Sequence, residues 1–251
     1  MDMSVRAEIY DKVSDARGKV ILQGFPDVGL VGSITVTYLV DQLQLREVGY
    51  VDSEALPPIA TIRNSEAKEL IRIYEGKTSI VFLSEIPIPS NLIRPLAREM
   101  IGWAKKKNIG RIYCLTGLAE PNRLEIDTPK IFIAGSNSKL VDELVDKLEA
   151  EALEEGFVAG INAELVKQGS RMGYDVGVLL AQSHYNYPDP GAAAQILLKM
   201  PKLIEEHVDV NPLLQSAEMV RMQLRDLMRR TSDTMGVMQK SKELELPPVY
   251  R

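Results

Sequence analysis

Apolar and polar residues alternate in blocks along the chain, and residues 19–38, KVILQGFPDVGLVGSITVTY, form the clearest block. Val20, Ile21 and Leu22 are a short apolar run, typical of a buried strand, that ends at a turn rich in glycine and proline. Beyond the turn, apolar residues recur every three or four positions, as in a helix. A strand that leads through a glycine-lined turn into a helix is the first half of a β-α-β unit, in which helices cover a mainly parallel sheet.

The rest of the pattern predicts the same alternation, and hence an α/β/α sandwich with a mainly parallel central sheet. Two short runs, 59–63 and 70–75, flank the polar stretch NSEAKE and predict a β-hairpin. The other expected strands are 47–52, 78–83, 111–115, 130–134 and 176–181. Helices are expected to end near residues 45, 107, 155, 173 and 207, and residues 1–18 are expected to lead in as an edge strand or arm.

From Leu213 onward the apolar residues follow a heptad, which predicts a long C-terminal helix. Its stripe includes Leu224, Met228, Met235 and Met238. This stripe either packs on its own domain or pairs with other copies in an oligomer, and Met-rich surfaces also suit varied clients. The chain thus divides into an α/β core (1–210), a helical segment (211–243) and an extended tail (244–251).

The tail ends in ELPPVYR. Pro247 and Pro248 prevent helix continuation and favour an extended spacer. Val249 and Tyr250 then have no expected partner within the core. An apolar residue, a tyrosine and the carboxylate of Arg251 on a stiff spacer form a peptide that can dock into a pocket carrying a cation.

Composition narrows the function classes. A formal net charge of −5 argues against nucleic-acid binding, because phosphate neutralisation requires a clustered basic surface. The single cysteine, Cys114, excludes an internal disulfide framework and a Cys-rich zinc site, and its apolar surroundings predict a core strand. No apolar run is long enough to span a membrane, so we expect a cytoplasmic protein.

Catalytic motifs are mostly absent. Gly24, Gly29 and Gly32 do not have the dinucleotide-binding spacing, and no lysine follows as in a phosphate-binding P-loop. Close packing is the favoured interpretation of these glycines, although phosphate binding at the helix start stays open. Glu85, at the carboxyl end of a predicted strand, is the best lone catalytic carboxylate, but the sequence shows no partner for it. We therefore expect no metal, no cofactor and no enzymatic activity.

Three ordered blocks carry a family resemblance: GFPDVGLVG at 24–32, EIPIPSNLIRPLA at 85–97 and YPDPGAA at 187–193. Together they resemble the proteasome assembly chaperone family, in its archaeal branch. The resemblance implies a fold like that of nucleoside phosphorylases without their activity. It also implies a homo-oligomer, expected to be a tetramer or pentamer, that binds the proteasome core particle.

Family members that bind the core particle end in hydrophobic-Tyr-any, which corresponds here to Val249, Tyr250 and Arg251. By this resemblance the Arg251 carboxylate pairs with a lysine between α-ring subunits, Tyr250 presses on the gate-forming turn, and Val249 fills the apolar mouth. The leading hypothesis is an ATP-independent activator or assembly chaperone. The alternatives are a holdase or adaptor for unfolded proteins, and a protein that binds a small ligand such as a nucleotide or nucleoside.

Overall fold

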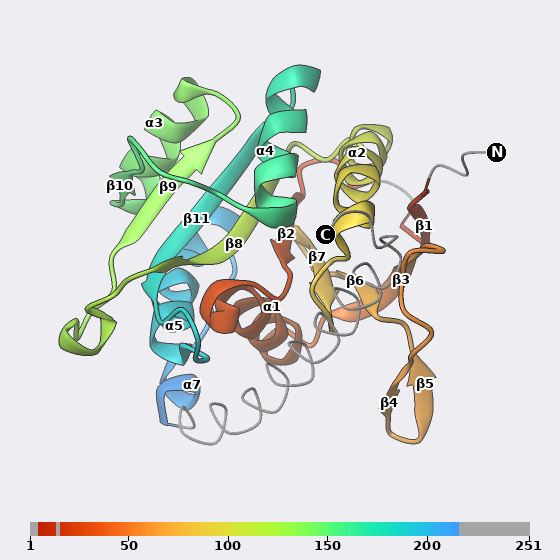
Figure 1. Ribbon diagram of the computed structural model, residues 1–251, viewed down its shortest axis with the longest axis horizontal. Coiled ribbons are helices and arrows are strands. Elements are labelled where there is room, and N and C mark those ends of the chain that lie inside the picture. Colours follow the sequence, from red (N-terminus) through yellow and green to blue (C-terminus); the bar gives the residue numbers. More distant parts are fainter. Residues whose placement is uncertain (1–4, 14–15, 216–251) are drawn as a thin grey trace, which may run out of the picture.

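A nine-stranded sheet runs through the centre of the molecule and separates two layers of helices (Figure 1). The computed structural model describes residues 5–13 and 16–215. In order across the sheet, the strands are β1 (Glu8–Asp11), β3 (Arg46–Asp52), β6 (Ile71–Glu75), β7 (Ser79–Ser84), β2 (Val20–Gly24), β8 (Arg111–Ala119), β11 (Val176–Ser183), β9 (Ile131–Gly135) and β10 (Glu151–Ala152).

The middle of the sheet is parallel. Strand β2 pairs in parallel with β7 and β8, and β8 pairs in parallel with β11. These strands are almost wholly buried, as expected when helices cover both faces of a sheet. Strands β6, β3 and β1 extend the sheet on one side by antiparallel pairing, and β9 pairs antiparallel with β11 on the other. The predicted α/β/α class is confirmed, with β1 as the expected N-terminal edge strand.

The helices divide between the two faces. Helix α1 (Val31–Gln42) and α5 (Pro190–Lys199) pack against each other, and with α3 (Ser138–Leu148) they cover one face. Helix α2 (Ser90–Lys106) packs against α4 (Gly160–Met172) on the other. The short helices α6 (Pro201–Ile204) and α7 (Asn211–Gln215) add Leu203 and Leu213 to the first layer.

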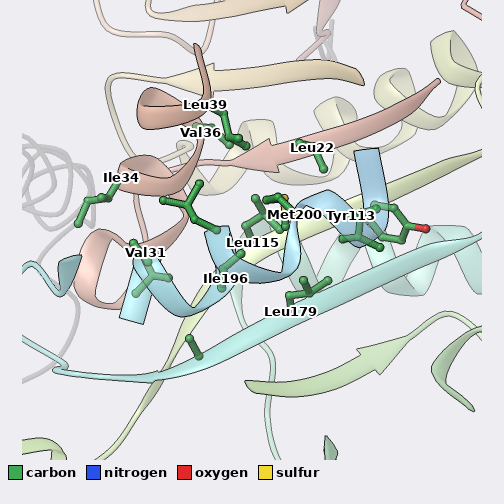
Figure 2. Packing of buried hydrophobic residues seen from close by; sticks show 14 of the residues in the cluster. Leu22, Val31, Ile34, Val36, Leu39, Tyr113, Leu115, Leu179, Ile196 and Met200 are labelled. Carbon is green, nitrogen blue, oxygen red and sulfur yellow. The ribbon is translucent and has the colours of Figure 1, made fainter. Parts of the chain in front are cut away.

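Helix α1 is held mainly by its apolar side chains. Val31, Ile34, Val36 and Leu39 are all buried and belong to one cluster with strand residues such as Leu115; in Figure 2, Ile34 points away from Leu115. On the opposite face, a second core includes Leu92, Leu96 and Met100 of α2. Cys114 lies in this second core, and burial raises the pKa of its thiol. The single cysteine is therefore a packed core residue, as its sequence context predicts.

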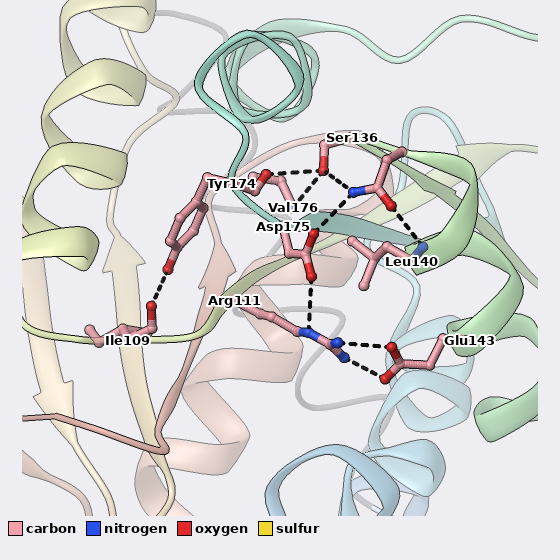
Figure 3. A network of polar contacts seen from close by, with 9 residues as sticks. Ile109, Arg111, Ser136, Leu140, Glu143, Tyr174, Asp175 and Val176 are labelled. Carbon is pink, nitrogen blue, oxygen red and sulfur yellow. Dashed lines mark hydrogen bonds and ion pairs between the residues drawn. The ribbon is translucent and has the colours of Figure 1, made fainter.

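A polar network fixes the amino ends of β8 and β11 (Figure 3). Arg111 donates to Glu143 of α3 at 2.8 Å and lies 3.3 Å from Asp175. Asn137 donates to Asp175 at 3.0 Å, and its side-chain oxygen accepts from the N–H of Leu140 at 2.9 Å, which caps α3. The network ties the start of α3 to the strands, at the end of the sheet away from the β2–α1 turn.

Three boundaries differ from the sequence prediction. The hairpin is formed by β4 (Thr61–Arg63) and β5 (Glu66–Lys68), so part of NSEAKE is a strand, whereas residues 71–75 join the main sheet as β6. Asn64 and Ser65 have φ of 50° and 65°, which permits the tight two-residue hairpin loop.

The helix expected to end near residue 155 ends at Leu148. Glu149 has a φ of 51° there, and residues 151–152 pair with β9. The helix expected to end near residue 207 is divided into α5 and α6, because Pro201 has no N–H with which to continue the hydrogen-bonded turns. Within the described ranges, no helix combines the length and apolar character that a membrane span requires.

Candidate functional site

The turn between β2 and α1 has an unusual backbone. Strand β2 ends at Gly24, and a short 3-10 helix, η1 (Val28–Leu30), precedes α1. Gly29 has a φ of 60°, where glycine is favoured, and Leu30 follows with a φ of 51°. Asp27 caps the 3-10 helix through its side chain.

The glycines of this turn lie where two backbone segments approach closely. A Cβ on Gly24 would lie 2.2 Å from the carbonyl oxygen of Gly32, and one on Gly32 would lie 2.1 Å from the carbonyl oxygen of Leu115. A Cβ on Gly29 would lie 1.9 Å from Ser183 Oγ. Close packing of α1 against β2 and β8, and of η1 against β11, therefore accounts for these residues, and phosphate binding is not needed to explain them.

The Asp27 carboxylate joins three elements at the carboxyl end of the parallel strands. Its Oδ1 accepts from the N–H of Val28 at 2.8 Å. Its Oδ2 accepts from Thr116 Oγ1 of β8 at 2.8 Å and from Asn162 Nδ2 of α4 at 3.0 Å. Burial raises the pKa of Asp27, and the hydrogen bonds from Thr116, Val28 and Asn162 oppose that shift without cancelling it.

Two buried amides lie on the same face of the sheet as this carboxylate. Asn162 is 1% exposed, and its Oδ1 has no hydrogen-bond partner. Gln23 is fully buried, and both its Oε1 and its Nε2 are unpartnered. Gly24 faces α1, so Gln23, the preceding strand residue, faces the α2 and α4 layer. Gln23 of β2 lies opposite Cys114 of β8. Thr116 is two residues further along β8 on the same face, so Gln23 and Thr116 are diagonal neighbours.

A buried ion pair links the third sequence block to the same turn. Arg123, in the 3-10 helix η2 (Arg123–Glu125), donates to both carboxylate oxygens of Asp189, at 2.7 Å and 3.1 Å. Asp189 also accepts from the N–H of Ala192 at 2.9 Å and so caps α5. Its own N–H donates to the carbonyl oxygen of Gly29 at 2.9 Å. A backbone hydrogen bond therefore joins residues 24–32 directly to residues 187–193.

Glu85 is not the isolated carboxylate that the sequence suggests. It pairs with Arg63 of the hairpin at 2.8 Å and with Arg72 of β6. Arg72 is 2% exposed, so the carboxylate compensates a buried guanidinium. This structural role accounts for a charged residue at the strand end.

Sequence reasoning did not single out Asp27, Asn162, Gln23, Thr116 or Arg123. Only Asp27 carried a local signal, since aspartate before a helical turn is a common N-cap. The others become neighbours through pairing of distant segments. In the part of the chain that the structure describes, no group of three or more His, Cys, Asp or Glu residues could hold a metal ion.

The predicted partner-binding residues lie outside the described ranges. These are Val249, Tyr250 and Arg251, the spacer residues Pro247 and Pro248, and the stripe residues Leu224, Met228, Met235 and Met238. Their roles stay predictions from the sequence.

Comparisons with known proteins agree with the fold. The chain is 27% identical over 208 residues to an uncharacterized protein of Methanocaldococcus jannaschii, covering 83% of this chain and 84% of that protein. It is 28% identical to Pyrococcus furiosus PbaA, an archaeal homolog of proteasome-assembly chaperone, with a TM-score of 0.83 over 91% of this chain and all of PbaA.

Pyrococcus furiosus PbaB, an archaeal proteasome activator, shares the fold at 19% identity, with a TM-score of 0.72 over 94% of this chain and 99% of PbaB. The model of the PAC2 family matches residues 21–228, which is most of the sequence. The chain belongs to the PAC2 family.

Proposed function

We propose that this chain is a homo-oligomeric proteasome-binding protein that docks residues 249–251 into the α-ring of the core particle. The observation that carries the proposal is the sequence Val249-Tyr250-Arg251 on a PAC2-family chain. The similarity to PbaA, which is described as a homolog of a proteasome-assembly chaperone, supports the proteasome as partner.

The tail has the physical properties that docking requires. Pro247 and Pro248 restrict the spacer before binding, which lowers the entropy lost when Val249 and Tyr250 enter a pocket. Three residues make a small contact, so one tail alone binds weakly. A tetramer or pentamer presents several tails at high effective concentration, and the combined affinity exceeds that of any single tail. In this proposal, residues 211–243 position the tails.

Gate opening would follow from Tyr250 pressing on the gate-forming turn, without ATP hydrolysis. The turn of residues 24–32 supports an ATP-independent mechanism, since its glycines are occupied by packing and no P-loop lysine follows. The protein then acts by binding and not by catalysis, in the cytoplasm where core particles work.

The decisive experiment adds the full-length protein to a latent archaeal core particle and follows hydrolysis of a fluorogenic peptide. We compare wild type, Tyr250→Ala and a deletion of residues 249–251. Tyr185→Ala is the matched control, because it removes a tyrosine that is 68% exposed on the body of the molecule. Co-sedimentation with the core particle is measured in parallel.

Stimulation by wild type and by Tyr185→Ala, and its loss in both tail variants, is the expected result. Tail-dependent co-sedimentation without stimulation of peptide hydrolysis would support tail docking but contradict gate opening, and would favour a role in assembly or as an adaptor. Binding that persists in the deletion variant would overturn tail docking, and absence of any binding would overturn the proteasome as partner.

A further inference from the structure

Tail docking makes no use of the polar cluster formed by Gln23, Asp27, Thr116 and Asn162. The cluster lies where β2 ends beside β8, near the start of α4. Two of its side chains, Thr116 and Asn162, donate hydrogen bonds of 2.8 Å and 3.0 Å to Asp27 Oδ2. Gln23 faces the same layer, one strand away from Thr116.

The cluster lies next to the position at which open α/β sheets bind ligands, because Gln23 belongs to β2. Strand β2 leads into α1 on one face, whereas its parallel neighbour β7 leads into α2 on the other. Connections that leave adjacent parallel strands to opposite faces create a crevice outside the carboxyl ends of those strands, and ligands bind there. Asp27 is partly exposed and Gly160 is exposed, so this end of the strands is the side from which a ligand would approach the buried amides.

The amides of Gln23 and Asn162 need hydrogen-bond partners that the described residues do not provide. Gln23 buries one acceptor and one amide donor group without partners, and Asn162 buries a further acceptor. Burying polar groups without hydrogen bonds is unfavourable, and native proteins rarely retain them unless a partner is supplied. Asn162 cannot turn away from the site, because its Nδ2 is held by Asp27. Helix α4 also begins at Gly160 without a side-chain cap, which leaves its first turn open toward this edge.

These groups define the ligand class. Gln23 Nε2 is a donor, whereas Gln23 Oε1 and Asn162 Oδ1 are acceptors, so the complementary molecule carries both donors and acceptors. The Asp27 carboxylate disfavours phosphate and other anions. We propose that Gln23 and Asn162 bind a small uncharged molecule with an N–H donor beside a carbonyl acceptor, such as a carboxamide or the lactam edge of a nucleobase. Asp27 and Thr116 are positioning residues that hold the Asn162 amide.

The test measures the thermal midpoint of the full chain with millimolar uracil, hypoxanthine, nicotinamide or inorganic phosphate, and ligand-observed saturation-transfer NMR with the same compounds. A ligand that binds only the native state raises the midpoint with its concentration. The variants are Gln23→Met, which keeps the side-chain volume, and Asn162→Leu. Ser79→Ala is the control, because it removes a buried unpartnered hydroxyl at the opposite end of the parallel strands, away from the cluster.

At least one amide-bearing probe is expected to raise the midpoint of wild type and of Ser79→Ala, with affinity about tenfold lower in Gln23→Met, as for one lost hydrogen-bonding pair. Phosphate is expected to have no effect. If Asn162→Leu does not fold, Gln23→Met decides, because it removes only unpartnered atoms and keeps a normal midpoint.

No response to any amide-bearing probe in wild type would overturn the proposal, and ordered waters on both amides in a crystal structure would then explain the cluster. An equal response in Gln23→Met would also overturn it, as would a response to phosphate alone. The proteasome is absent from these assays, so their outcome is independent of tail docking.

Discussion

Replacing Gly32 by alanine tests whether the turn between β2 and α1 is built by backbone packing. Gly32 lies in the first turn of α1, and its added Cβ would lie 2.1 Å from the carbonyl oxygen of Leu115. Ordinary contact is 3.4–4 Å, so the overlap exceeds 1 Å. The opposing atom belongs to the backbone of the central strand β8 and cannot rotate away. Helix α1 must therefore move outward.

The structure sets the size of the effect. Val31, Ile34, Val36 and Leu39 of α1 are each at most 4% exposed. Burial of four such side chains contributes about 8 kcal/mol at ~2 kcal/mol each. A shift of about 1 Å forfeits a quarter to a half of the dispersion contacts, or about 2–4 kcal/mol on that scale. Alanine regains up to about 1 kcal/mol over glycine in a helix. We therefore expect a net loss of about 1–3 kcal/mol.

Urea unfolding followed by circular dichroism measures this loss as a change in midpoint at constant slope. Gly102→Ala is the matched control, because Gly102 lies within α2 and its added Cβ would meet nothing within 4 Å. This control should gain about 0.5–1 kcal/mol. If Gly32→Ala matched wild type within about 0.5 kcal/mol, the packing explanation of the turn would be refuted.

Three further variants test the raised pKa of Asp27 and the effect of burial on two ion pairs. Burial raises the pKa of Asp27, so the folded state binds its proton more tightly than the unfolded state, and the free energy of unfolding falls as pH rises from about 4 through that raised pKa. Asp27→Asn should lack this fall in urea unfolding at a series of pH values, and parallel curves for the two proteins would contradict the shift. Arg123→Met leaves the buried Asp189 uncompensated and should lower the free energy of unfolding by about 3–5 kcal/mol. Arg63→Met, which breaks a pair involving a half-exposed arginine, should lower it by under about 1 kcal/mol, and equal losses would contradict the role of burial.

The sequence predicts the layers of the fold well because hydrophobic spacing is a local property. The β2–turn–α1 unit, the buried strand β7 and the edge strand β1 follow the predicted pattern. The predicted ends of helices and strands are wrong where pairing with another segment determines the local structure. Glu66 and Ala67 are exposed and carry no apolar strand pattern, yet residues 66–68 form β5 because Asn64 and Ser65 adopt positive φ. Residues 151–152 continue a charged helical pattern, yet they pair with β9.

The candidate site is less predictable, because its members are far apart in the chain. Asp27 lies 89 residues from Thr116 and 135 residues from Asn162, and no spacing rule connects them. Gln23 belongs to an apolar strand, where only the burial of its unpartnered amide distinguishes it. The partners of Glu85 come from β6 and from the hairpin, whose pairing the sequence assigned incorrectly.

The three family blocks make contacts that build the fold, whereas the tail is the segment proposed to bind the proteasome. The Asp189 N–H binds the Gly29 carbonyl, and Arg123 holds Asp189, so the first and third blocks jointly shape one edge of the sheet. The second block begins α2, whose Leu92 and Leu96 fill the core on the other face. These contacts explain why a chain carrying the blocks has the PAC2 fold. All of these contacts are made within the fold, so a chain could keep every block and lack the tail. The proposed proteasome docking relies on residues 249–251, so a variant altered only there is the sharpest test of that proposal.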